Sequence, residues 1–170
     1  MNVNLAELAK EIHAAAVEKG FWDVADAENK HLAKMVSEIG EIVQADRAGI
    51  MYEVEHEGAK PEGVIAEMAD FVMMVLDLYA KYAVDFDAVA EECIDSDGLK
   101  SLVAVTDTYM IAMFFAAKLL ECAMCNEGEL AITIHVADAW AEAHGFDLWA
   151  VIRQKMEYNK SRPALHGRAY

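Results

Sequence analysis

Residues 62–82 read EGVIAEMADFVMMVLDLYAKY, a run in which apolar side chains occupy positions all around a helical turn. A helix that is apolar on almost every side is buried, so this run predicts the central helix of the fold. Two acids, Glu67 and Asp70, interrupt it, and Asp77 follows one heptad later on their face. Buried carboxylates are costly unless something positive meets them, so these acids mark a candidate site.

A second pair of acids, Glu38 and Glu41, has the same three-residue spacing as Glu67 and Asp70. Residues three apart share a helix face, so two such pairs facing each other bring four carboxylates into one small volume. Carboxylates that close cannot all stay ionised alone, and few basic residues lie near them in the sequence. A divalent cation that prefers oxygen ligands, Mg²⁺ or Mn²⁺, is the expected partner.

The composition and the hydrophobic periodicity both favour helices throughout the chain. Its 170 residues are 56% hydrophobic with only two prolines, which is typical of one compact, helical domain. Apolar spacing predicts helices over residues 4–20, 26–48, 62–82, 99–126 (either continuous or broken), 129–144 and 148–160, with a short one ending near Cys93. In the second of these, the apolar stripe consists of Leu32, Met35, Val36, Ile39 and Val43. We therefore expect an all-α helical bundle over residues 1–170.

The basic residues are few, and they are concentrated near the C-terminus. A net charge of −16 argues against a basic face for nucleic acid. Lys155, Asn159 and Arg162, however, follow one face of the last predicted helix. Ammonium and guanidinium groups suit phosphate oxygens, so we expect this face to bind the phosphates of a ligand and not the metal.

The cysteines and the hydropathy indicate in which cellular compartment the protein is expected. Cys122 and Cys125 have the spacing of a metal or redox pair, but no second pair or histidine cluster completes a zinc site. Buried structural thiols are the favoured interpretation. No signal peptide and no uninterrupted apolar run of membrane-spanning length is recognisable, so we expect a cytoplasmic protein without membrane contact.

The order of these motifs resembles the MazG-like all-α nucleoside triphosphate pyrophosphohydrolases. Glu38-x-x-Glu41 followed by Glu67-x-x-Asp70 looks like the signature of that family. The tail KMEYNKSRP at residues 155–163, with His166-Gly167 after it, is similar to the end of the family pattern, and Gly20-Phe21-Trp22-Asp23 is similar to the segment ahead of its second helix. The resemblance covers roughly residues 1–92 and 145–168.

This resemblance implies hydrolysis of a nucleoside triphosphate to the monophosphate and pyrophosphate with Mg²⁺. The four acids Glu38, Glu41, Glu67 and Asp70 would hold one or more metal ions, and one of them would act as the general base. The phosphates would be bound by Lys155, Asn159 and Arg162, with help from Lys34. Two roles are open for Trp22: packing at the edge of the core, which its spacing favours, and stacking on the base.

The stretch from about Cys93 to His144 departs from the compact family pattern, because an additional helical pair separates the acids from the tail. Whether the tail completes the site of its own chain or of a partner is therefore open. The methionine and phenylalanine content of the helices exceeds what one small core absorbs, which predicts a homodimer or homotetramer. The alternative to an enzyme is a non-catalytic, oligomerising regulatory protein that keeps the helical fold.

Overall fold

The computed structural model describes residues 3–84, 103, 105–124 and 130–167, and this part of the chain is all-α. Its helices are α1 (Leu5–Glu18), α2 (Ala27–Ala48), α3 (Val64–Lys81), α6 (Thr108–Met124), α7 (Ile132–Ala143) and α8 (Leu148–Lys160), followed by the 3-10 segment η2 (Ala164–Gly167). Within these residues there is no β-strand, only an isolated bridge between Glu53 and Glu62. The predicted all-α fold class is confirmed. Among the described helices, none has the length and apolar character needed to cross a membrane.

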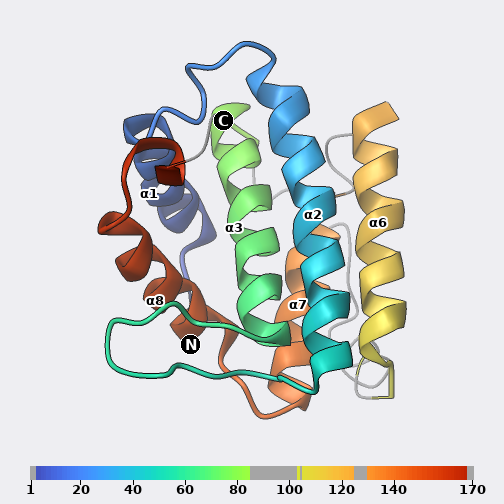
Figure 1. The fold of residues 1–170 in the computed structure, drawn as a ribbon. Coiled ribbons are helices and arrows are strands. Elements are labelled where there is room, and N and C mark those ends of the chain that lie inside the picture. Colours follow the sequence, from blue (N-terminus) through green and yellow to red (C-terminus); the bar gives the residue numbers. More distant parts are fainter. Residues whose placement is uncertain (1–2, 85–102, 104, 125–129, 168–170) are drawn as a thin grey trace.

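Helix α3 lies at the centre of the bundle, as its apolar sequence predicts. It packs against α1, α2, α7 and α8, and Figure 1 shows it enclosed between α1 and α8 on one side and α2 on the other. Its aromatic and aliphatic side chains join one continuous hydrophobic core, in which Phe71 stacks on Phe115 of α6 with ring centroids 4.7 Å apart. Any polar side chain on α3 is therefore held by a rigid, buried element.

Local capping sets the ends of the helices that the sequence predicts best. The Asn4 side chain accepts a hydrogen bond from the Glu7 amide at 3.2 Å, and the Asp147 side chain accepts one from the Ala150 amide at 3.0 Å. Gly49 ends α2 with a φ of 73°, a conformation that favours glycine. The predicted bounds of the first, second and last helices agree with the structure to within two residues.

The loop between α2 and α3 fixes how these two helices meet. The amides of Val64 and Ile65, at the start of α3, donate to the carbonyl oxygens of Ile50 and Met51 at 3.0 and 3.1 Å. Gly63 makes this approach possible, because a Cβ at that position would lie 2.8 Å from the Met51 backbone. The end of α2 is thereby tied to the start of α3, and the two helices run side by side.

An additional helical pair does separate α3 from α8, and the run of residues 99–126 is broken, which is one of the two alternatives that the sequence leaves open. Helix α6 begins at Thr108 and not at residue 99. Asp107 interrupts the apolar run, and its carboxylate accepts a hydrogen bond from the Met110 amide at 2.8 Å, as a helix cap does. Helix α6 packs against α2, and α7 packs against α3 and α8. The predicted short helix near Cys93, and Cys125, lie outside the described residues.

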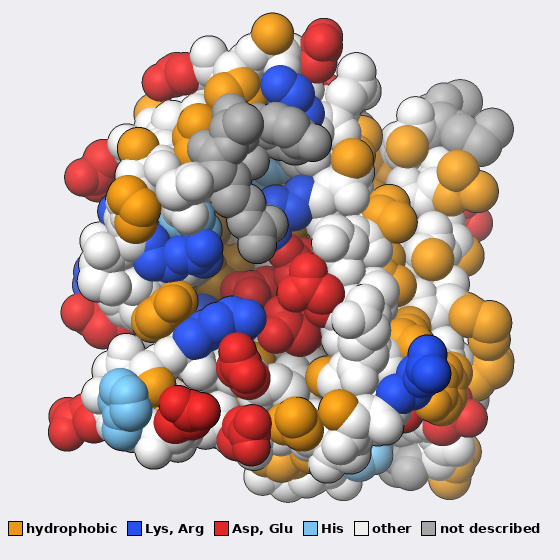
Figure 2. All heavy atoms as spheres, viewed as in Figure 1, with side chains coloured by type: hydrophobic (Ala, Val, Ile, Leu, Met, Phe, Trp, Pro, Cys, Tyr) orange, Lys and Arg blue, Asp and Glu red, His pale blue; other side chains and the backbone are white. Residues whose placement is uncertain are grey.

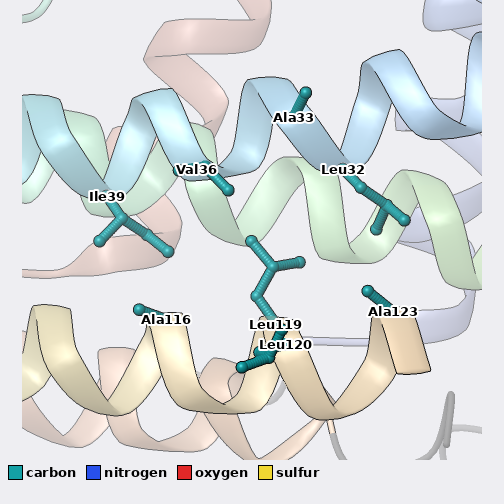
Figure 3. Close-up of a pocket in the computed structure, with 8 residues that line it drawn as sticks. All are labelled: Leu32, Ala33, Val36, Ile39, Ala116, Leu119, Leu120 and Ala123. Atoms are coloured by element: carbon teal, nitrogen blue, oxygen red, sulfur yellow. The ribbon is translucent and has the colours of Figure 1, made fainter. Parts of the chain in front are cut away.

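The face that α2 buries differs from the predicted stripe. Ile42 is fully buried, whereas Val36 is 60% exposed. Figure 3 shows the reason: α2 and α6 are separated by an open groove, and Val36 of α2 points into it toward Leu119 of α6. The groove has a volume of about 380 Å³ and is lined only by Leu, Ile, Val and Ala side chains. It lacks the polar groups that orient a ligand in a specific pocket.

Candidate metal and phosphate site

Three acids from α2 and α3 converge beneath the surface. Glu38, Glu67 and Asp70 each offer one carboxylate oxygen, and these oxygens all lie within 4.8 Å of one another. Glu38 and Glu67 are buried, with 2% and 6% of their surface exposed, and Asp70 is half-buried. Such a cluster of oxygen donors is the chemistry that divalent cations prefer. We call these three residues the acidic triad.

Glu41, the fourth predicted ligand, lies beside the triad without joining it. Its side chain is half-buried and accepts a hydrogen bond from the Ser37 hydroxyl at 3.2 Å. Its charge contributes to raising the pKa of Glu38, so the two carboxylates are close enough to interact. The structure therefore brings together three of the four acids predicted from the sequence, with the fourth nearby.

Each acid of the triad has a lysine partner. Lys155 of α8 places its Nζ 2.7 Å from Asp70 Oδ2 and 3.8 Å from Glu67 Oε2. Lys60 Nζ lies 3.7 Å from Glu67 Oε1, and Lys34 Nζ forms an ion pair with Glu38 Oε1. The expectation that the acids lack basic partners is wrong. The nearby sequence could not reveal Lys155, which is 85 positions from Asp70.

The same contact resolves which site the tail completes. Helix α8 packs against α3 of its own chain, and the Lys155 side chain, only 1% exposed, reaches the triad there. The lysine that was expected to bind phosphates thus lies against the predicted metal ligands.

Burial makes the triad electrostatically unusual. Burial raises the pKa of the Glu67 carboxyl to about 7; the Lys155 ammonium opposes this shift, while the Asp70 carboxylate adds to it. The pKa of Glu38 is also raised, again mainly by burial and against the charge of Lys34. Glu67 Oε2 is buried and accepts no hydrogen bond from any described residue. An unsatisfied buried carboxylate oxygen is rare in folded proteins, and here the Lys155 ammonium lies 3.8 Å from it, beyond hydrogen-bond distance.

Basic and imidazole groups border the acidic triad on the side of the α8 C-terminus. Arg162 is half-buried, and its Nη1 donates to Asn159 Oδ1 at 3.5 Å. Burial, together with the charges of Arg162, Lys34 and Lys19, lowers the pKa of His166 to about 4. His166 is therefore uncharged at neutral pH. Figure 2 shows Asp and Glu side chains gathered in a hollow at the centre of this face, with Lys and Arg side chains around it.

Sequence reasoning missed the contribution of Lys60 and His166 to this region. Lys60 lies in the loop before α3, where its position next to Pro61 gave no periodic signal. His166 was noted in the tail motif without a role. The segment that carries it has left-handed backbone at both Leu165 and His166, with φ of 48° and 51°. Strained non-glycine backbone of this kind is concentrated at functional sites.

Trp22 lies in a separate polar cluster and not in the acidic triad. Its indole N–H donates to the Asp77 carboxylate at 3.0 and 3.2 Å, and its ring stacks on His31 with centroids 5.0 Å apart. The Lys81 ammonium lies 3.8 Å from the ring centroid, and His13 donates to Asp77 at 2.6 Å. These contacts are those of a side chain that packs at the edge of the core; base stacking by Trp22 remains a prediction.

Comparisons with known proteins place the chain in no family: no family model, no curated protein and no solved structure matches it. Fold and site therefore define only a class, an all-helical protein whose buried acidic triad could hold a metal ion. The likeness to the MazG-like family remains a resemblance of motifs.

Proposed function

We propose that this protein hydrolyses a nucleoside triphosphate to the monophosphate and pyrophosphate in a metal-dependent reaction. The observation that carries the proposal is the acidic triad in contact with the buried Lys155 ammonium. The charges of Arg162 and Asp70 both act on the pKa of His166, so both lie near that imidazole. Oxygen ligands for a metal and cations for phosphate are the two requirements of metal-assisted phosphoryl chemistry. Both requirements are met here within a single chain.

The donor set fits Mg²⁺, and Mn²⁺ is the second candidate. Glu38, Glu67 and Asp70 offer carboxylate oxygens without nitrogen or sulfur ligands, and the orphaned Glu67 Oε2 is an oxygen that a cation would satisfy. When bound, such a metal neutralises phosphate oxygens and lowers the pKa of its water. Glu41, beside the triad, would orient or deprotonate that water.

The remaining predicted residues would bind the nucleotide. Arg162 and Asn159 are linked to each other at the α8 C-terminus, and Lys155 connects that helix to the triad. Guanidinium and ammonium groups there would hold the α-, β- and γ-phosphates while Lys34 neutralises charge from the α2 side. We further propose a cytoplasmic protein that acts as a homodimer or homotetramer, with no nucleic acid or membrane partner.

One observation favours the alternative, a non-catalytic helical oligomerising protein. The three lysines already pair with the three triad acids, so the cluster can also be interpreted as a structural ion-pair network. Buried ion pairs of this kind also occur in proteins where they have no catalytic role. Loss of either partner would be destabilising, because the other charge would stay buried and unpaired. The Glu67 oxygen that has no hydrogen-bond donor among the described residues favours the enzyme, since most buried acceptors in a structural network are satisfied.

The test is to incubate the protein with a panel of ribo- and deoxynucleoside triphosphates and Mg²⁺ or Mn²⁺, and to identify both products. We expect monophosphate and pyrophosphate from at least one nucleotide. Glu67→Gln should abolish the release, while Glu57→Gln, an exposed acid in the loop before α3, should leave it unchanged. Absence of pyrophosphate with every nucleotide and both metals would overturn the proposal in favour of the non-catalytic alternative.

A further inference from the structure

The charges of the acidic triad are balanced by lysines of the same chain. Glu38, Glu67 and Asp70 carry three negative charges when ionised, and Lys34, Lys60 and Lys155 bring three positive charges within ion-pair distance. A divalent cation that entered this partly buried cluster alone would add two positive charges to it, and the neighbouring carboxylates of Glu41 and Glu62 would offset only part of them. Such an excess is expensive, because charges are poorly solvated there.

Of the three lysines, Lys155 is the one that cannot simply withdraw into water. The side chains of Lys34 and Lys60 are 42% and 38% exposed, so their ammonium groups can move outward and become hydrated. The Lys155 side chain is 1% exposed and extends from α8, which packs directly on α3. Its ammonium contacts Asp70 at 2.7 Å and lies 3.8 Å from the orphaned Glu67 Oε2.

We propose that Lys155 is a built-in counter-cation that competes with the divalent metal for Asp70 and Glu67. This inference rests on the proposed function, since it concerns the same site. As long as the Lys155 ammonium has no anion other than Asp70 and Glu67 to pair with, it occupies these carboxylates and the metal binds weakly. The phosphates of an arriving nucleotide provide that anion, because the Arg162 side of α8 is where they would bind. Metal and triphosphate then bind as a coupled pair.

The coupling is reciprocal. If triphosphate raises the affinity for metal by some factor, metal raises the affinity for triphosphate by the same factor. Lys155 is thus a positioning residue. Removal of a metal ligand weakens metal binding, but removal of Lys155 should tighten it. If the role of Lys155 were purely structural, its removal would instead loosen the site and weaken metal binding.

The experiment is to titrate Mn²⁺ into the full chain and measure free metal by electron paramagnetic resonance, without nucleotide and with a non-hydrolysable triphosphate analogue. The proteins are wild type, Lys155→Gln, Lys155→Met and the control Lys160→Gln. Lys160 lies on the same helix, but its ammonium is at the surface, 2.6 Å from exposed Glu157. Glutamine keeps a hydrogen-bond donor for Asp70 and removes only the charge.

Without nucleotide, both Lys155 variants should bind Mn²⁺ roughly ten- to a hundredfold more tightly than wild type, in the usual range of coupling between sites. The analogue should tighten Mn²⁺ binding to wild type more than to either variant, and Lys160→Gln should behave as wild type. If a variant is unstable in isolation, thermal unfolding gives the same comparison, because Mn²⁺ should raise its midpoint more than that of wild type.

Mn²⁺ binding to the Lys155 variants that is equal to or weaker than in wild type would overturn the inference while leaving the metal site intact. Failure of all four proteins to bind Mn²⁺, with or without analogue, would overturn the proposed metal-dependent function itself. Pyrophosphate release by wild type, measured separately, distinguishes the two failures. Release of pyrophosphate would support the proposed function even if the Lys155 variants do not bind Mn²⁺ more tightly, whereas its absence would count against the proposed function itself.

Discussion

Glu67 occupies the least favourable position for a carboxylate in the acidic triad. It is buried, one of its oxygens has no hydrogen-bond donor among the described residues, and its pKa is raised to about 7. The folded protein therefore retains a proton on this group at pH values where the unfolded chain has released it. Between the ordinary value of 4.5 and about 7, the native state binds more protons than the unfolded state.

It follows that the free energy of unfolding contributed by Glu67 falls as pH rises through that window. In the presence of a chelator, urea denaturation of wild type should show stability decreasing from about pH 5 to pH 7.5. Glu67→Gln should show a smaller decrease, because glutamine does not titrate. Parallel stability profiles for the two proteins would contradict the assigned environment of Glu67.

The acids of the triad should differ in what their removal does to stability, although each removal should abolish most activity. Asp70→Ala removes the carboxylate 2.7 Å from the Lys155 ammonium, which is 1% exposed, and leaves it Glu67 Oε2 at 3.8 Å, so the loss should approach the value of about 3–5 kcal/mol for a broken buried pair. Glu38→Ala strands Lys34, which is 42% exposed and can be hydrated, so the fold should be little affected. Urea denaturation of both variants makes the comparison, and equal losses would contradict it.

The activity of the four acid variants tests the metal assignment directly. Glu38→Ala, Glu41→Ala, Glu67→Ala and Asp70→Ala should each lose most turnover at saturating Mg²⁺. Near-wild-type turnover in three of the four would show that the site is assigned to the wrong residues.

Arg162 should act on phosphates and leave the metal unaffected. Its guanidinium contacts Asn159, and no ion pair joins it to the acidic triad in the described residues. Arg162→Ala should lower kcat/KM by roughly ten- to a hundredfold, the value of a charged hydrogen bond of about 1.5–3 kcal/mol. Mn²⁺ titration without nucleotide should be unchanged; weakened Mn²⁺ binding with normal kcat/KM would reverse the assignment. Lys160→Ala is the control.

At the scale of elements, Asp77 connects α3 to three other segments of the chain. It accepts hydrogen bonds from His13 of α1 and from Trp22 in the turn after α1, and His31 of α2 lies 3.7 Å away. Burial raises the pKa of Asp77, and these donors oppose that shift. The cluster therefore holds α1 and α2 on α3 through polar contacts as well as through the core.

Asp77→Ala should destabilise the protein by about 1–3 kcal/mol, because it leaves the Trp22 N–H and the His13 imidazole without their acceptor. Asp77→Asn should cost less, since the amide oxygen still accepts from Trp22. Asp23→Ala, an exposed acid next to Trp22, is the matched control. Thermal unfolding followed by circular dichroism measures all three, and a loss in the control as large as in Asp77→Ala would exclude the buried cluster as the cause.

The helix boundaries show which local signals the sequence carries well. Asn4, Gly49 and Asp147 act within four residues of the backbone groups that they cap, so their spacing alone predicts three of the helices. The sequence leaves open whether residues 99–126 form one helix or a broken one, because Asp107 sits inside a long apolar run that masks its capping role. The stripe of α2 was misassigned because α6, which leaves Val36 beside a groove, is itself distant in the sequence.

For the whole molecule, the pairing of acids could be predicted, but the counter-ion of Asp70 could not. Spacing of three residues predicts that Glu67 and Asp70 share a face, and the apolar run around them predicts burial, which is complete for Glu67 and partial for Asp70. Lys155 reaches Asp70 only because α6 and α7 return the chain so that α8 packs on α3. That contact depends on which helices pack against each other in space, and no local sequence pattern predicts this arrangement.

Apolar side chains on the outer face of α6 support the predicted self-association. Tyr109, Met110, Met113 and Leu120 are 45%, 52%, 58% and 62% exposed, although Phe115 of the same helix is fully buried. A contiguous exposed apolar surface favours contact with another protein. Light scattering at micromolar concentration should show a homodimer or homotetramer, and Met113→Glu should reduce its mass, unlike Lys118→Glu as a control on the same helix. A monomeric wild type would contradict the prediction.

The separation between Asp70 and Lys155 has a consequence for biosynthesis. A ribosome adds residues from the N-terminus, so the acids of α2 and α3 exist for 85 further elongation steps before Lys155 is made. Long chains begin to fold during synthesis. On the nascent chain, Asp70 is therefore made before its Lys155 partner, and the proposed metal ion would reach the acids ahead of α8. Refolding of the finished chain in a chelator reverses that order, and ribosome-bound and refolded protein should therefore reach the same structure by different routes.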